Sequence, residues 1–184
     1  MESAFAWIGQ IAEWFGNFIP TWELVRATEN AVKFLPGGKT KVLGPGIHWY
    51  WPVTTEMETV AVVRQVLDTQ PQTIMTQDHE PVYVSGLVVY TISNLHAYMV
   101  ENYDAADNLD DIVQTAIRKT IVNRDFLTIQ KARADVDNRL TSDVQKALEP
   151  FGIEVEAARI TDFSRARVTN MVGNGLISLH AGGN

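Results

Sequence analysis

The stretch that most constrains the fold is the run from Val82 to Ser93, in which apolar residues occupy most positions. An extended strand turns alternate side chains to opposite faces, and here both faces are apolar. The pattern predicts a long strand in a sheet that is covered on both sides, with a β-bulge near Gly86. The two predicted faces carry Val82, Val84, Val88, Tyr90 and Ile92 on one side, and Tyr83, Leu87 and Val89 on the other.

The segments around this run predict an α+β fold. Beyond residue 95 the apolar period becomes 3.6 residues, which predicts one helix from about 107 to 121 and a second from about 130 to 149. A closing strand is expected at 153–160. Shorter strands are predicted at 24–27, 31–35, 47–51, 60–67 and 73–76, the first two joined by a hairpin-like turn at Glu29-Asn30.

Composition bounds the classes of function. The 184 residues suffice for one ordinary domain or two small ones, and 46% hydrophobic with 20% charged residues is typical of a globular chain. The net charge of −7 and the lack of a Lys/Arg-rich run argue against nucleic-acid binding. Since the chain has no cysteine, it has neither a disulfide framework nor thiolate chemistry.

The first 21 residues predict an amphipathic helix that associates with a membrane. They lack the basic region and cleavage site of a secretory signal. The 16 residues from Ala4 to Ile19 would span about 24 Å as a helix, less than the roughly 30 Å of a bilayer core, so a helix lying in the interface is favoured over a single-pass span. The alternative is a helix packed on a protein core or a neighbouring subunit. The predicted lipid-contacting residues are Phe5, Trp7, Ile8, Ile11, Trp14, Phe15, Phe18 and Ile19.

The sequence LGPGIHWYWP (43–52) predicts a tight turn followed by an aromatic strand. Pro45 suits the second position of a type II turn, and Gly46 accepts the positive φ that follows. Ile47, Trp49 and Trp51 then point to one side of the strand. Two interpretations stay open at this point: a strand buried on one face, or a segment seated at a membrane surface.

Six motifs in order resemble the band-7, or SPFH, domain shared by stomatins, prohibitins and flotillins, over about residues 25–163. The motifs are VRATENAV (25–32), GPGIHWYWP (44–52), RQV (64–66), TIMTQDHEPVYVSGLVVYTISN (73–94), AIRKTIVNRDFLTI (116–129) and EPFGIEVEAARITDF (149–163).

The resemblance implies a mostly antiparallel sheet followed by two helices and a closing strand, in a domain at 22–163 that is mainly β over 22–95 and α/β over 96–163. It also implies membrane association through the N-terminal segment, assembly into rings or cages, organisation of membrane microdomains and regulation of partners such as a membrane protease or channel, without enzymatic activity. Trp49 and Trp51 would lie near the lipid. Because a tail of only 21 residues (164–184) follows Phe163, we expect a short member without the long C-terminal coiled coil.

The uneven distribution of charge predicts a contact between copies of the chain. The stretch 68–111 is acidic and the stretch 118–167 is richer in basic residues, so the two could face each other between neighbours and repeat around a ring. A soluble shell, whose N-terminal helix packs on a neighbouring subunit, is the alternative assembly. The predicted interface residues are Asp104, Asp110, Asp111, Arg118 and Arg124.

No arrangement of residues predicts catalysis, a metal site or a cofactor. The four histidines are scattered without metal-ligand spacing. Asp78-His79-Glu80 is a polar cluster that favours a turn over a metal site, and a hydrolase using this region is the enzymatic alternative. Gly37-Gly38-Lys39-Thr40 lacks the first glycine of a phosphate loop, and Ser85-Gly86 lacks the nucleophile elbow of a serine hydrolase.

Overall fold

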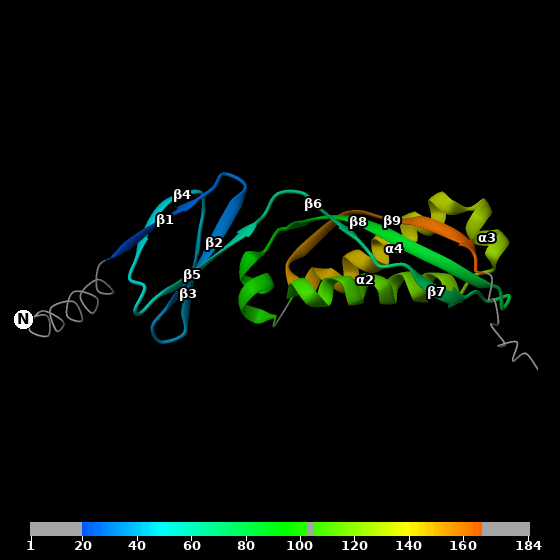
Figure 1. Cartoon of the computed structure of the whole chain (residues 1–184), viewed down its shortest axis with the longest axis horizontal. Coiled ribbons are helices and arrows are strands. Elements are labelled where there is room, and N and C mark those ends of the chain that lie inside the picture. The colour runs from blue at the N-terminus through cyan, green and yellow to red at the C-terminus, as the bar shows by residue number, and fades with distance from the viewer. Residues whose placement is uncertain (1–19, 103–104, 167–184) are drawn as a thin grey trace, which may run out of the picture.

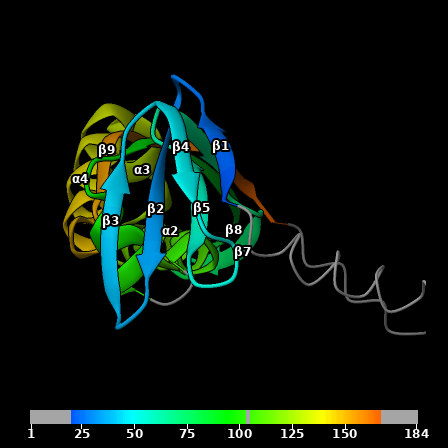
Figure 2. The ribbon, with the colours of Figure 1, turned by 90° about the vertical axis from the view of Figure 1, so that its left-hand side faces the viewer.

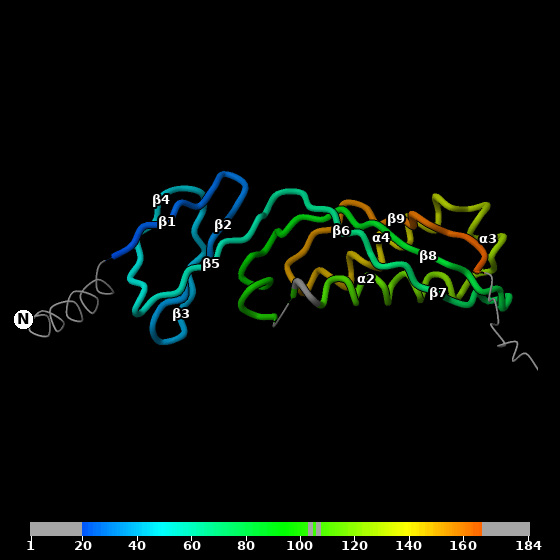
Figure 3. The backbone as a smooth tube through the Cα atoms, viewed as in Figure 1, coloured from blue at the N-terminus to red at the C-terminus, as the bar shows by residue number. Residues whose placement is uncertain are grey.

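The computed structural model describes residues 20–102 and 105–166, which form an elongated molecule with two parts (Figure 1). An all-β part, residues 20–61 and here called the β-lobe, lies at the N-terminal end. A layered α/β part, residues 65–166 and here called the layered domain, occupies the rest of the length. The backbone trace in Figure 3 passes from the β-lobe to the layered domain through the short connection between Ala61 and Gln65.

The β-lobe, which faces the viewer in Figure 2, contains two small antiparallel sheets. Strand β1 (Thr21–Val25) pairs with β4 (Gly46–Tyr50). Strand β2 (Glu29–Leu35) lies between β3 (Lys39–Leu43) and β5 (Glu56–Ala61). The expected hairpin around Glu29-Asn30 is therefore wrong, because both residues belong to β2 and the two predicted strands pair with other partners.

The layered domain has a four-stranded antiparallel sheet built around one long strand, β8 (Pro81–Ile92). Strands β6 (Gln65–Asp68) and β7 (Gln72–Met75) pair with successive parts of one edge of β8. Strand β9 (Ile153–Arg165) pairs with the whole of the other edge. The predicted strand at 60–67 is in fact two strands, since β5 ends at Ala61 and β6 begins at Gln65.

Helices cover one face of this sheet. They are α2 (Ala105–Val122), the short α3 (Phe126–Lys131) and α4 (Arg133–Leu148), with a π-helical turn at Ala97–Glu101 and a 3-10 turn at Glu149–Phe151. The core lies between helices and sheet, where Val88, Ile117 and Leu140 are almost fully buried. The helical periodicity predicted α2 and α4 but not α3, because α3 is too short to show a period.

The prediction that β8 is covered on both faces is wrong for the described chain. Its inward residues, including Val82, Val84 and Val88, are buried under the helices. On the other face Tyr83 is exposed and Leu87 and Val89 are only half-buried. The predicted bulge is confirmed, because the register between β8 and β9 shifts at Gly86.

The outer edge of β9 is closed by polar side chains of α4. The amide of Val155 donates to Gln145 Oε1 over 2.6 Å, and the amide of Ile160 donates to Asp137 Oδ1 over 3.1 Å. Between them, the Thr141 hydroxyl accepts from the amide of Ala158 and lies 3.1 Å from its carbonyl oxygen. The Arg133 guanidinium donates to the Ile160 carbonyl. Since residues 133, 137, 141 and 145 are spaced by four, they form one stripe along the helix.

Candidate membrane-facing surface

The pairing of β1 with β4 gathers four large apolar side chains on one face of the β-lobe. Trp22 lies opposite Trp49, and Leu24 lies opposite Ile47. Alternation along each strand places these four residues on the same side. Each is between 57% and 67% exposed. We call this set of four the aromatic face.

The aromatic face is held in place by its neighbours. The Trp22 and Trp49 rings meet edge to face, with centroids 5.2 Å apart and planes inclined by 83°, a favourable geometry for aromatic pairs. The Lys33 ammonium donates to the Trp49 carbonyl oxygen over 3.0 Å and so ties β4 to β2. On the reverse side of the pair, Val25 is buried at 1% exposure.

The exposed apolar surface continues past the end of β4. Trp51 and Val53 are 47% and 57% exposed. The amides of Thr54 and Thr55 both donate to the Trp51 carbonyl oxygen, which folds this segment into a tight turn. Before β4, Gly46 has the predicted positive φ, at 142°. The predicted type II turn is not formed, because that turn needs a φ of about +80° and the chain makes only a bend at Pro45.

Leaving these large apolar side chains in contact with water costs free energy. Apolar surface removed from water stabilises by about 25 cal/mol per Å², so a cluster of large exposed side chains gains free energy when it meets lipid or protein. Tryptophan, with an apolar body and one N–H, is a residue favoured at membrane interfaces. The arrangement can therefore bind an apolar surface, and it presents no reactive groups.

The predicted membrane contacts of Trp49 and Trp51 stay predictions. Both side chains are exposed, so the described residues do not bury the tryptophan side of β4. The other eight predicted residues, Phe5 to Ile19, lie outside the described residues. No helix within the described ranges 20–102 and 105–166 is long and apolar enough to cross a membrane.

Sequence reasoning missed Trp22 and Leu24. The available signal was their two-residue spacing at the start of the predicted strand at 24–27, on the segment that continues from the predicted amphipathic helix. The missing information was the partner strand, since only the pairing of β1 with β4 places Trp22 against Trp49.

The predicted interface residues are not brought together on one surface. Asp111 is exposed in a groove between α2 and α4. Asp110 accepts from Gln114 on another side of the same helix. Arg118 donates to the Gln72 side chain, and Arg124 donates to the carbonyl of Thr120. Asp104 lies outside the described residues. Their contact with a neighbouring copy stays a prediction.

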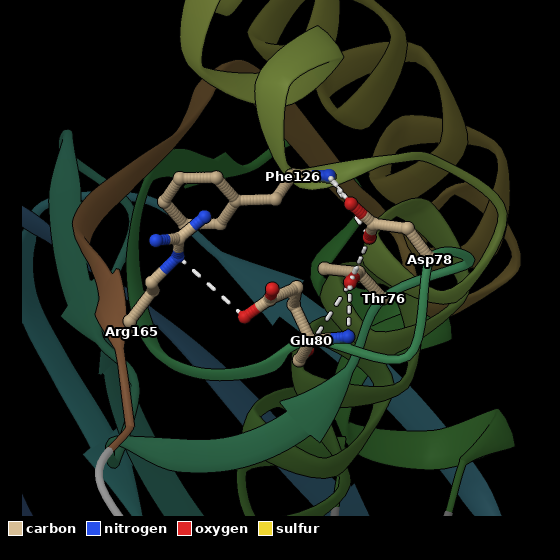
Figure 4. A network of polar contacts seen from close by, with 5 residues as sticks. All are labelled: Thr76, Asp78, Glu80, Phe126 and Arg165. Carbon is tan, nitrogen blue, oxygen red and sulfur yellow. Dashed lines mark hydrogen bonds and ion pairs between the residues drawn. The ribbon is translucent and has the colours of Figure 1, made fainter.

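The Asp78-His79-Glu80 segment forms the turn that joins β7 to β8, as expected (Figure 4). The Asp78 carboxylate accepts from the Thr76 hydroxyl and from the amide of Phe126 at the start of α3. These hydrogen bonds, led by the one from Thr76, lower the pKa of Asp78 below its ordinary value of 3.8. His79 occupies the turn with a φ of 60°.

The same turn is joined to the end of β9. The Arg165 guanidinium lies 3.5 Å from Glu80 Oε2 and 4.7 Å from the centre of the Phe126 ring. The Phe126 ring stacks on Phe163 with centroids 5.1 Å apart. The polar groups of this segment thus have structural partners, and within the described ranges no three His, Cys, Asp or Glu side chains form a metal-binding group.

Comparison with known proteins places this fold in a family. The family model of the SPFH domain / Band 7 family matches residues 23–170, which is most of the chain. The chain belongs to the SPFH domain / Band 7 family. The match includes the layered domain and the β-lobe from Glu23 onward, so Trp22 of the aromatic face lies just before it.

Several stomatins resemble this SPFH chain. Mouse stomatin is 28% identical over 132 residues, covering 71% of the chain and 45% of that protein. A stomatin homologue of Pyrococcus horikoshii is 29% identical over 142 residues, covering 76% and 53%. Stomatin-2 of Caenorhabditis elegans is 27% identical over 161 residues, covering 85% and 42%. The SPFH chain spans about half the length of these relatives.

Proposed function

We propose that this SPFH protein is a membrane-associated scaffold that assembles from copies of itself and organises or regulates membrane partners, such as a protease or a channel. The observation that carries the proposal is the aromatic face. It lies on β1 and β4, and β1 directly follows the N-terminal segment predicted to associate with lipid. Membership in a family with stomatin relatives supports the same function.

In this proposal the β-lobe is the end of the molecule that meets the membrane. The aromatic face and Trp51 enter the interfacial region, and the predicted helix at 1–21 lies beside them. The layered domain, at the other end of the long axis, then projects away from the lipid and is available for assembly (Figure 1). The role is a non-enzymatic one, because the proposal assigns no bond-making step to any residue.

The test is flotation of the full chain with liposomes. Replacing Trp22 and Trp49 by serine removes two large side chains that are 67% and 57% exposed. If both enter the interface, the loss is about 3 kcal/mol, or roughly a hundredfold in partitioning. The matched control is Tyr83→Ser, which removes an exposed aromatic ring from the layered domain, and which we expect to float like the wild type.

A second measurement locates the contact. In a variant with Trp7 and Trp14 replaced by phenylalanine, the remaining tryptophans are Trp22, Trp49 and Trp51. We expect brominated lipids to quench their fluorescence. Unquenched fluorescence, together with flotation that the double serine variant leaves unchanged, would refute the membrane-facing role of the β-lobe. Failure of the unaltered chain to float would favour the soluble shell.

A further inference from the structure

The outer face of the four-stranded sheet carries an apolar strip that nothing in the described chain covers. The register places Val66 of β6, Val89 of β8 and Ala157 of β9 in one row across three strands. Leu87 lies in the next row, beside Arg159 of β9. Val66 is 59% exposed, and the other apolar members are half-buried. We call this strip the outer sheet face.

A second apolar surface lies on the opposite side of the layered domain. A groove of about 520 Å³ runs between α2 and α4 on the side of the helices that faces away from the sheet. Its floor is apolar, with Ile112, Ala116, Ala147 and Phe151. The α2 positions that line it, including Asp111 and Thr115, are turned away from the helical stripe that packs on the sheet.

Both surfaces carry charges of both signs. The α2–α4 groove is lined by Asp111 and Asp143 against Lys119. The outer sheet face carries Arg64 and Arg159 against Glu156 and Asp68, the last of which is exposed on β6 opposite Leu87. Arg64 and Glu156 form an ion pair of 2.5 Å, which leaves Arg159 as the exposed guanidinium beside the apolar strip.

The edge of the sheet at β9 is closed to a neighbour. Because Arg133, Asp137, Thr141 and Gln145 bond the outer backbone groups of β9, a second copy cannot extend the sheet there by adding a strand. A neighbour that packs on this part of the molecule must use a face. An antiparallel sheet can leave one face in water, but an exposed apolar strip on that face gains free energy when a partner covers it.

We propose that the α2–α4 groove of one copy packs on the outer sheet face of the next copy. The proposal rests on the self-assembly in the proposed function and names its surfaces. Since the two surfaces differ, the contact is head-to-tail and repeats from copy to copy, closing into a ring if the rotation permits. Asp143 and Asp111 of one copy then face Arg159 of its neighbour.

The absence of cysteine makes this contact testable by cross-linking. Ala147→Cys marks the groove and Ala157→Cys marks the outer sheet face, and both positions are half-buried. With a short bismaleimide, we expect neither single variant to cross-link to itself. A mixture of the two single variants should give dimers, and the double variant should give a ladder of multimers.

Charge exchange provides the second test. Asp143→Arg places like charges across the proposed contact, so we expect mass photometry to shift towards monomers. Adding Arg159→Asp should restore the larger species, while Arg139→Asp, at an exposed α4 position outside the groove, should not. Thermal melts that match the wild type show that the variants fold.

The outcomes separate the two proposals. If the chain floats and forms oligomers but the mixed cysteine variants do not cross-link, the head-to-tail contact is overturned and the membrane scaffold stands. Self-cross-linking of a single variant would also overturn it, because that result requires a two-fold contact. A chain that is monomeric on liposomes overturns this contact together with the self-assembly in the proposed function.

Discussion

Thr141→Val is expected to destabilise the layered domain strongly although it changes almost no volume. The Thr141 hydroxyl accepts from the amide of Ala158 over 2.9 Å and lies 3.1 Å from its carbonyl oxygen. Ala158 is fully buried, so water cannot replace the lost partner. Valine keeps the shape and the β-branched rotamer preference of threonine but has no hydroxyl.

The magnitude follows from the Ala158 amide, which loses its acceptor; the hydroxyl has a single proton, and its oxygen lies nearer the Asp137 carbonyl oxygen, at 2.8 Å, than the Ala158 carbonyl oxygen. An unsatisfied buried donor costs about 1–3 kcal/mol, so we expect a loss of about 1–3 kcal/mol in the free energy of unfolding. For a domain of about 100 residues, each kcal/mol lowers the Tm by about 4–8 °C, so the Tm should fall by about 4–24 °C. Urea denaturation and calorimetry measure the two quantities.

Two variants control this experiment. Ser142→Val places the same side chain at the next, exposed position of α4 and should change the stability little. Thr141→Ser keeps the hydroxyl and should recover most of the loss. If Thr141→Val unfolds within about 0.5 kcal/mol of the wild type, the range of ordinary surface substitutions, the hydroxyl does not satisfy the β9 edge and the reasoning fails.

Three further outcomes are expected. Gly152→Ala should lower the Tm or abolish folding, since Gly152 has a φ of 72° and an added Cβ would overlap the Asn94 carbonyl oxygen; a melt equal to the wild type contradicts this. Because the folded pKa of Asp78 is lowered, its carboxylate stabilises the fold above about pH 3.8 and loses this effect as the pH falls through the folded pKa. Asp78→Asn should therefore be less stable than the wild type at neutral pH, with a difference that closes in acid, as urea titrations at several pH values would show. Arg64→Ala should change stability by less than about 1 kcal/mol, because its ion pair with Glu156 is solvent-exposed.

The sequence predicted elements whose signal is local. The run at 82–93 gave β8 and the bulge at Gly86, and the 3.6-residue period gave α2 and α4. Pairing was not predictable from the same patterns, because the partner of a strand is chosen by contacts far away in the chain. The expected hairpin at Glu29-Asn30 failed for this reason, since β1 pairs with β4 and β2 with β3 and β5.

The candidate site shows the same difference between features set by local sequence and features set by strand pairing. The alternation after Gly46 was sufficient to place Ile47 and Trp49 on one side of a strand, whereas Trp51 lies past its end. It could not show that Trp22 stands opposite Trp49, which is a consequence of pairing. The prediction that both faces of β8 are covered failed because an apolar pattern shows only that a face is suited to burial. In the described part of this chain, nothing covers Leu87 on the outer face.

The path of the backbone between the two parts has a consequence for how such chains can diversify. All strands of the β-lobe come from one uninterrupted segment, and the chain crosses into the layered domain once, between Ala61 and Gln65. A single recombination junction there would exchange the complete lobe without cutting any strand of the larger sheet. Chimaeras joined at this point would therefore exchange the surface proposed for membrane attachment while keeping the surfaces proposed for assembly.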